Sequence, residues 1–186
     1  MKKIIAVILI VVCHSFVHAQ DNINKELSKL FLDLKLELVP DKMIESSNLK
    51  FEKFVRDIPD FQDKETIFLT EFTENKAVKS KIVAGEIKII QRDGKIKYGI
   101  YQVVQNLKFQ TLEDLQYEYN RLSKQYEELA RYIKTDTNED GNEYFINHIT
   151  KTITIKDKLK SIKLDFSYSV PRKKETGYHL FISYSF

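Results

Sequence analysis

The residues best suited to chemistry in this sequence lie in one short acidic stretch, Asp136-Thr-Asn138-Glu-Asp140-Gly141. Oxygen-bearing side chains stand at positions 1, 3 and 5, and a glycine that permits a sharp turn stands at position 6, as at the start of a calcium-binding loop. Calcium takes six to eight oxygen ligands, so further donors are needed, and Glu143 is the nearest candidate. The stretch therefore predicts a weak calcium site built from Asp136, Asn138, Asp140 and Glu143.

The stretch resembles only the first half of an EF-hand loop. Position 12 is Asn147, where a bidentate glutamate is expected, and the sequence that follows favours a strand rather than a second helix. A solvated acidic turn, in which Gly141 meets a backbone requirement, is the alternative interpretation. Calcium is the one cofactor that the sequence suggests.

Two histidines, His148 and His179, lie in segments expected to form strands. A strand between them would place their backbones about 10 Å apart, which is too far for a compact zinc pair. The sequence holds no HExxH spacing, no Gly-x-Ser-x-Gly motif and no glycine-rich phosphate loop. It gives no positive indication of an enzyme and assigns no catalytic residue. A hydrolase that uses carboxylates or a metal is the alternative, because the spacing of paired carboxylates is spatial.

Hydroxyl-bearing residues recur at every second position in the C-terminal segments, which places them on one face of a sheet. Such a face, with an occasional aromatic ring, could receive a sugar, an extended strand or another protein. The alternative is that threonine favours strands and serine tolerates solvent. The candidate binding residues are Thr150, Thr152, Thr154, Ser167, Ser169, Phe181 and Ser183.

A long amphipathic helix over Thr111 to Lys134 is the element around which the rest is expected to pack. Its apolar residues recur at spacings of three and four, and Thr111 is placed to cap its first turn. A coiled-coil seam is the alternative, but the flanking strand-like segments favour a sheet as its partner. The apolar stripe consists of Leu112, Leu115, Tyr119, Leu122, Tyr126, Leu129 and Ile133.

The flanking segments predict an α+β fold with an antiparallel sheet of about six strands, in the order three strands, long helix, three strands. Two short helices are expected before the first strand, the first from Asp21 through at least Leu34 and the second over Ser47 to Asp57, ending at Ile58-Pro59. A strand is the alternative for the end of the first segment, because Leu32, Leu34, Leu36 and Leu38 alternate. The expected strands cover Thr66 to Thr73, Lys79 to Gln91, Lys95 to Gln105, Glu143 to Lys156, Leu159 to Val170, and Gly177 to Phe186.

The N-terminus has the pattern of a secretory signal peptide over residues 1–19. Lys2 and Lys3 precede an apolar run from Ile4 to Val12, and small residues stand before Gln20. The run is too short for a membrane span, so no transmembrane segment is expected after cleavage. Residues 20–186 are expected to form a single domain, exported to the periplasm or secreted.

The charge balance limits the classes of partner. The full chain carries 30 Lys and Arg against 27 Asp and Glu, and removal of Lys2 and Lys3 makes the balance nearly even, which argues against a nucleic-acid partner. Its single cysteine, Cys13, lies in the expected signal peptide, which excludes disulfides and thiol chemistry in the exported chain. The sequence therefore predicts a non-enzymatic binding or structural module of the cell envelope, with an unidentified protein or small ligand as partner.

Overall fold

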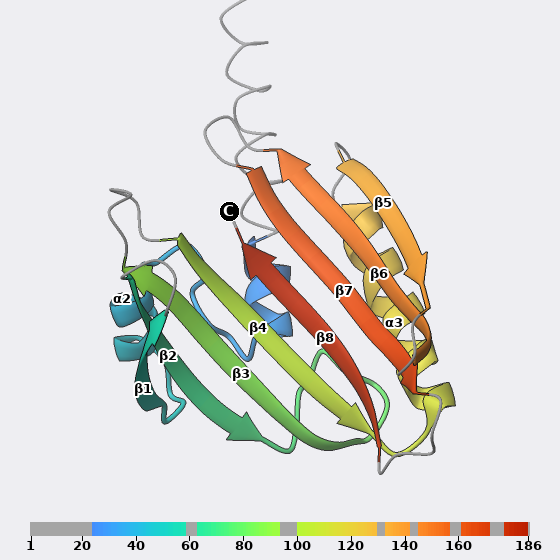
Figure 1. Cartoon of the computed structure of the whole chain (residues 1–186), viewed down its shortest axis with the longest axis horizontal. Helices are drawn as coiled ribbons and strands as arrows, with labels where there is room; N and C mark the ends of the chain where they lie inside the picture. The colour runs from blue at the N-terminus through green and yellow to red at the C-terminus, as the bar shows by residue number, and fades with distance from the viewer. Residues whose placement is uncertain are drawn as a thin grey trace, which may run out of the picture.

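A computed structural model describes residues 24–58, 63–93, 100–129, 133–141, 145–156, 161–171 and 177–185 of the chain. Their main feature is an eight-stranded sheet in which each strand is antiparallel to its neighbours (Figure 1). The strands lie in the order β1-β2-β3-β4-β8-β7-β6-β5. Their bounds are Glu52–Ile58 for β1, Asp63–Phe72 for β2, Ile82–Asp93 for β3, Ile100–Phe109 for β4, Ile133–Asp140 for β5, Phe145–Lys156 for β6, Ser161–Pro171 for β7 and Tyr178–Ser185 for β8.

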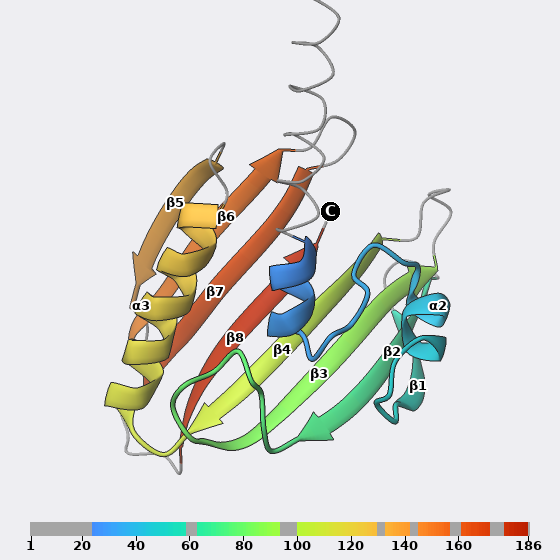
Figure 2. The ribbon, with the colours of Figure 1, turned by 180° about the vertical axis from the view of Figure 1, so that it is seen from behind.

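The described helices all lie on one side of the sheet (Figure 2). A helical segment over residues 24–30 and α2, Pro40–Glu45, precede β1, and α3, Leu112–Leu129, connects β4 to β5. The helix α3 contacts β4, β6, β7 and β8. The opposite side of the sheet, which we call the open face, is covered by none of the described helices (Figures 1 and 2).

The amphipathic stripe of α3 forms part of the core, as the sequence predicts. Its inward residues Leu115, Tyr119, Leu122 and Tyr126 are buried, each at a gross gain of about 1.5–3 kcal/mol before entropy is counted. The predicted cap is also confirmed, because the Asp114 N–H donates to Thr111 Oγ1 over 3.1 Å.

The C-terminal end of α3 differs from the prediction. The helix ends at Leu129 rather than Lys134, and the residues from Ile133 onward form β5. Ile133 pairs with Ile155 of β6, so the segment expected to form the last turn of the helix instead begins a strand that pairs with β6. The acidic stretch that was expected to form a turn belongs to this strand.

The second predicted N-terminal helix, over Ser47 to Asp57, is wrong. Residues Glu52–Ile58 instead form β1, which pairs along its length with β2. The apolar residues of this segment are spaced as in a helix, but pairing with β2 stabilises the extended conformation instead. The mixed α and β class and the antiparallel sheet are confirmed, but the sheet has eight strands rather than about six, because β1 and β5 were not predicted.

The first predicted helix is shorter than expected. The chain is helical over residues 24–30, and the backbone then turns sharply at Leu32 and Asp33, whose φ angles are 55° and 63°. The Asp33 N–H donates to the Ser28 carbonyl over 2.7 Å, which closes the end of the helix. The short helix α2 follows after an irregular segment and buries Pro40 and Met43.

The topology contains the same unit twice. Each half begins with helix and continues as a meander of four antiparallel strands, β1 to β4 and β5 to β8. The last strands of the two meanders, β4 and β8, pair in the middle of the sheet, and the first strands, β1 and β5, form its two edges. The two units are therefore joined by one continuous hydrogen-bonded sheet.

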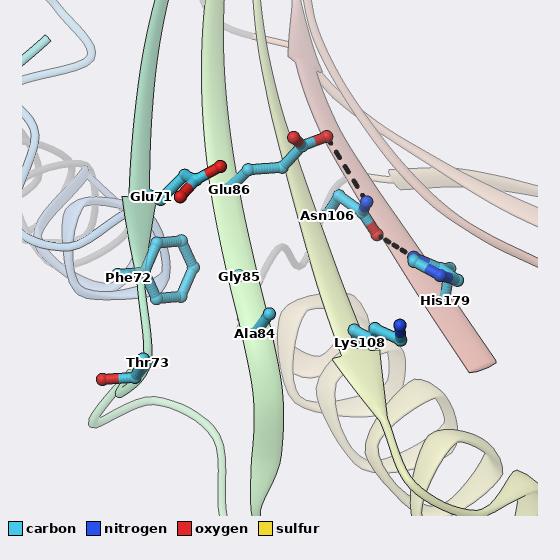
Figure 3. Close-up of a pocket in the computed structure, with 9 residues that line it drawn as sticks. All are labelled: Glu71, Phe72, Thr73, Ala84, Gly85, Glu86, Asn106, Lys108 and His179. Atoms are coloured by element: carbon cyan, nitrogen blue, oxygen red, sulfur yellow. Dashed lines mark hydrogen bonds between the residues drawn. The ribbon is translucent and has the colours of Figure 1, made fainter. Parts of the chain in front are cut away.

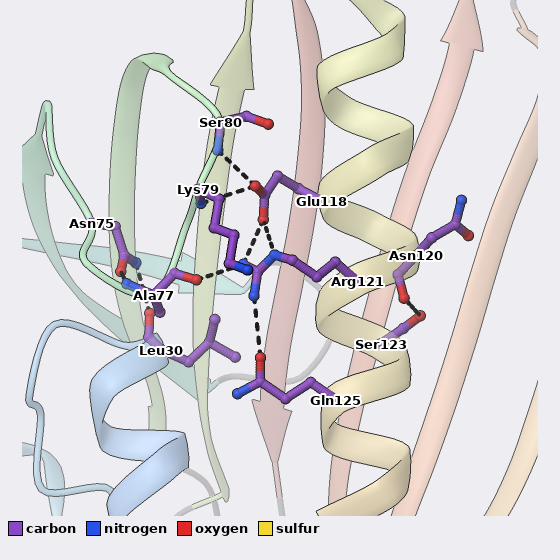
Figure 4. Close-up of polar contacts among 10 residues, drawn as sticks. All are labelled: Leu30, Asn75, Ala77, Lys79, Ser80, Glu118, Asn120, Arg121, Ser123 and Gln125. Carbon is purple, nitrogen blue, oxygen red and sulfur yellow. Dashed lines mark hydrogen bonds and ion pairs between the residues drawn. The ribbon is translucent and has the colours of Figure 1, made fainter.

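A buried ion pair on α3 attaches the loop between β2 and β3 to the helix (Figure 4). The fully buried Glu118 accepts hydrogen bonds from the N–H groups of Lys79 and Ser80, over 2.9 and 2.7 Å. Arg121 pairs with Glu118 over 2.6 Å and donates to the Ala77 carbonyl over 2.6 Å. Side chains of the second unit thereby fix a loop of the first.

The expected signal peptide, residues 1–19, lies outside the described residues. Within the described ranges, no helix combines the length and the apolar character needed to cross a membrane.

Candidate functional site

The hydroxyl-bearing residues singled out in the sequence come together on the open face. Thr150 of β6 is opposite Ser167 of β7, which is opposite Phe181 of β8. In the next row, Thr152 and Ser183 both lie opposite Asp165. Alternation along the strands places Thr154 and Ser169 on the same face. The strands β6, β7 and β8 thus present all seven candidates side by side.

Hydrogen bonds between strands hold several of these hydroxyl groups in place. Asp165 accepts from Thr152 over 2.6 Å and from Ser183 over 3.3 Å. His148 is hydrogen-bonded to Ser169 over 2.7 Å and to Thr150 over 3.1 Å. The face is therefore an ordered polar surface, and Asp165 is a member of it that the sequence did not single out.

A hollow of about 490 Å³ extends this face over β2, β3, β4 and β8 (Figure 3). Its floor includes Asn106, whose amide nitrogen donates to Glu86 over 3.4 Å and whose amide oxygen accepts from the His179 ring over 3.0 Å. The His179 ring is stacked on the Phe181 ring, with centroids 6.1 Å apart. The residues lining the hollow are Glu71, Phe72, Thr73, Ala84, Gly85, Glu86, Asn106, Lys108 and His179.

Acidic groups dominate one wall of the hollow. Glu71 and Glu86 are directly opposite each other on β2 and β3, an arrangement of like charges that is unfavourable by itself. The ammonium group of Lys88 lies 2.9 Å from Glu86 and offsets part of this charge. Phe181, with 40% of its surface exposed, lies opposite Asn106 on β8 and supplies an apolar ring next to the floor of the hollow. The arrangement is suited to binding a polar ligand that also has an apolar surface.

The residues of the predicted calcium site are only partly described. The backbone from Asp136 to Asp140 is extended in β5 and pairs with β6, where Asp136 lies opposite Thr152 and Asp140 opposite His148. Alternate residues of a strand are about 7 Å apart, so this backbone lacks the tight curvature of a calcium loop. Glu143 lies outside the described residues. The calcium site stays a prediction, which the extended backbone does not favour.

The two histidines occupy the positions expected from the strand order. His148 is on β6 and His179 on β8, with β7 between them. In the described part of the chain, no three His, Cys, Asp or Glu side chains are grouped so that they could hold a metal ion. Each histidine instead makes the hydrogen bonds given above to the open face.

A second hollow of about 540 Å³ lies on the helix-covered side, between α3 and β5 to β7. Tyr119 and Tyr168 meet edge-to-face in its lining, with ring centroids 4.9 Å apart. Lys151 and Glu127 form an ion pair of 2.5 Å there. Two of the charged side chains that line this hollow therefore neutralise each other, which makes it the weaker candidate site.

Three residues of the site, Asn106, Glu86 and Glu71, were not predicted from the sequence. The signal for Asn106 was present, because Asn106 and Lys108 alternate with the buried apolar residues Leu107 and Phe109 at the end of β4. The signal for the two glutamates was absent, because only the pairing of β2 with β3 brings them together.

Comparison of the chain with protein-family models, curated proteins and solved structures found no match. The function is therefore inferred from the side chains and their arrangement alone.

Proposed function

We propose that this protein is an exported, non-enzymatic binding module of the cell envelope, and that the open face of the sheet is its binding surface. The observation that carries the proposal is the ordered row of polar side chains from β6 to β8, which continues into the hollow around Asn106. A surface whose side chains are already held by hydrogen bonds loses little conformational entropy on binding. Rigid strands also position such groups more accurately than loops do.

A saccharide is the ligand class that suits this surface best. Sugar rings have an apolar C–H face, which can pack on the exposed ring of Phe181. Their hydroxyl groups can donate to the carboxylates of Glu71 and Glu86 and bond with the amide of Asn106. These groups lie within one continuous face, so one ligand could contact both the ring and the polar wall.

The binding surface can be tested with a photo-crosslinking amino acid in place of Phe181. Tyr117, an exposed residue of α3 on the other side of the sheet, provides the matched control position. After irradiation with a cell-envelope fraction, we expect a glycosidase-sensitive adduct at position 181 and none at position 117. A protein adduct at position 181 would support the open face as the binding surface but would show that its ligand is a protein rather than a saccharide. Equal labelling at both positions, or none at 181, would overturn the proposal.

The captured saccharide then allows a quantitative test. Replacing Asn106 by alanine removes one hydrogen-bonding group from the floor of the hollow and should weaken binding about tenfold in calorimetric titration. The matched control is Asn48→Ala, a change of the same type at an exposed residue outside the sheet. Equal affinities for the two variants would contradict a role for the hollow.

A further inference from the structure

The edge strand β1 is exposed over almost its whole length. Residues 52–57 are all exposed, and among them are two large apolar side chains, Phe54 at 48% and Val55 at 58% of their surface. Among the described strands β1 pairs only with β2, so its outer row of backbone N–H and C=O groups faces away from the sheet. An exposed edge strand with apolar side chains is a template for pairing with another strand.

The sequence of β1 is complementary to itself when two copies run antiparallel. If Phe54 lies opposite the partner's Phe54, then Glu52 lies opposite the partner's Arg56, and the reverse pair forms across the two-fold axis. On the other face, Val55 lies opposite the partner's Lys53. This register joins opposite charges and places two aromatic rings together, each of which favours cross-strand pairing.

The local structure is compatible with these contacts. Arg56 pairs with the buried Glu65 of β2, but two-thirds of its side chain stays exposed, and a guanidinium group has five N–H donors. The Lys53 ammonium group lies 5.4 Å from the centre of the Phe68 ring, so its aliphatic stem covers the sheet beside Val55. Arg56 can therefore hold Glu65 and a carboxylate of a second copy at the same time.

The other edge of the sheet differs in charge. The strand β5 carries acidic residues at Asp136, Glu139 and Asp140, and only Lys134 is basic. Each copy of β5 has three acids and one lysine, so two copies that pair with each other keep an excess of negative charge, and a charged edge strand is a common protection against association. Charge complementarity thus distinguishes β1 from β5 as the edge for self-association.

We propose that the chain forms a two-fold symmetric dimer by antiparallel pairing of two β1 strands, with Phe54 at the axis. The two eight-stranded sheets then form one continuous sheet, and both open faces lie on the same side. The dimer doubles the binding surface without covering β6 to β8.

A cysteine crosslink tests the register. In the full chain with Cys13→Ser, which removes the only native cysteine, Phe54→Cys places two Cα atoms about 4.5–5.5 Å apart, within disulfide range. Val55→Cys is the control, because in this register its two Cα atoms are about 8 Å apart and cannot be bridged. We expect an oxidised dimer for position 54 and not for position 55. A crosslink at 55 alone, or at neither position, would overturn the proposal.

Sedimentation of the unmodified chain gives an independent test. Each chain has a mass of 22.0 kDa, and we expect a particle of twice that mass. Glu52→Arg places like charges opposite each other twice and should raise the dimer dissociation constant about tenfold or more. Lys50→Glu, just outside the paired segment, is the control. The proposal fails if the parent chain is a monomer at about 100 μM, a concentration at which dimers of ordinary stability form, or if the Glu52→Arg dimer is unweakened while its circular dichroism is unchanged.

Discussion

At the residue scale, Glu118 connects α3 to the loop between β2 and β3. Its carboxylate is fully buried and is satisfied by two backbone N–H groups and by Arg121. The arginine in turn reaches the carbonyl of Ala77 in the loop between β2 and β3. A buried charge of this kind is tolerated because every one of its acceptor positions has a donor nearby.

We expect Glu118→Ala to lower the free energy of unfolding by about 3–5 kcal/mol, because it leaves two loop N–H groups without an acceptor and removes the carboxylate that neutralises the partly buried Arg121. Urea denaturation followed by circular dichroism measures this change. Glu128→Ala on the same helix breaks an exposed pair with Lys124 and should cost less than about 1 kcal/mol. Similar losses for the two variants would contradict the structural role of Glu118.

Gln105, unlike Glu118, is a buried polar side chain whose polar atoms are not satisfied by hydrogen bonds within the described part of the chain. It lies on β4, fully buried on the helix-covered side, and neither its amide nitrogen nor its amide oxygen has a hydrogen-bond partner within the described part of the chain. A buried amide without partners costs about 1–3 kcal/mol.

Gln105→Met keeps the length of the side chain and removes both polar atoms, so it should raise the free energy of unfolding by about 1–3 kcal/mol. The measurement is the denaturation midpoint in urea. Gln102→Met, on the open face of the same strand, is the control and should change the midpoint little. A destabilised Gln105→Met variant would show that the amide has a partner beyond the described residues.

At the scale of elements, tyrosine side chains attach the N-terminal segment to the sheet and to α3. Tyr101 of β4 donates to the Leu36 carbonyl over 2.8 Å, and Tyr126 of α3 donates to the Glu26 carbonyl over 2.7 Å. Burial raises the pKa of both hydroxyl groups, and it raises the pKa of Tyr119 and Tyr184 to about 12. Deprotonation of Tyr101 or Tyr126 would remove the O–H group that donates to the backbone carbonyl.

These shifts predict alkaline unfolding. Because the folded-state pKa lies above the unfolded value near 10, the contribution of these tyrosines is fully present below pH 10 and is lost as the pH rises toward about 12. The loss should be on the order of 1.4 kcal/mol per pH unit for each tyrosine in that window. Thermal midpoints from pH 8 to 12 measure it.

Variants at two positions of α3 separate this effect from general alkaline damage. Tyr126→Phe removes one titrating group, so its stability should fall less steeply above pH 10 than that of the parent. Tyr117→Phe, at an exposed position, should keep the steepness of the parent. Identical profiles for Tyr126→Phe and the parent would contradict the assignment.

At the scale of the whole molecule, two similar four-stranded units share one sheet. The pairing of β4 with β8 is continuous over eight residue pairs, and the Glu118 ion pair links the units a second time. Units joined through a shared core and a shared ladder are expected to unfold together.

We therefore expect a single thermal transition whose calorimetric enthalpy equals the van't Hoff enthalpy. Val104→Pro on β4 would remove a backbone donor at the junction and should weaken both units together. Two separate transitions in the parent chain would show that the units are independent domains.

Sequence alone determined the elements whose signal is local. The spacing of Leu115, Leu122 and Tyr126 identified α3, and alternation identified the six strands that became β2, β3, β4, β6, β7 and β8. The same alternation placed Thr150, Ser167 and Phe181 on one face, because side chains of a strand alternate whatever its partner is.

Only the tertiary structure decided the rest. The strands β1 and β5 exist because β2 and β6 pair with them, and their own sequences suit a helix and an acidic turn as well. Asn106 meets His179 because β4 and β8, which are distant in the chain, are neighbours in the sheet, and Glu71 lies opposite Glu86 because of the register in which β2 pairs with β3. Strand pairing is a contact between segments that do not adjoin in sequence, so no local pattern specifies which strands meet.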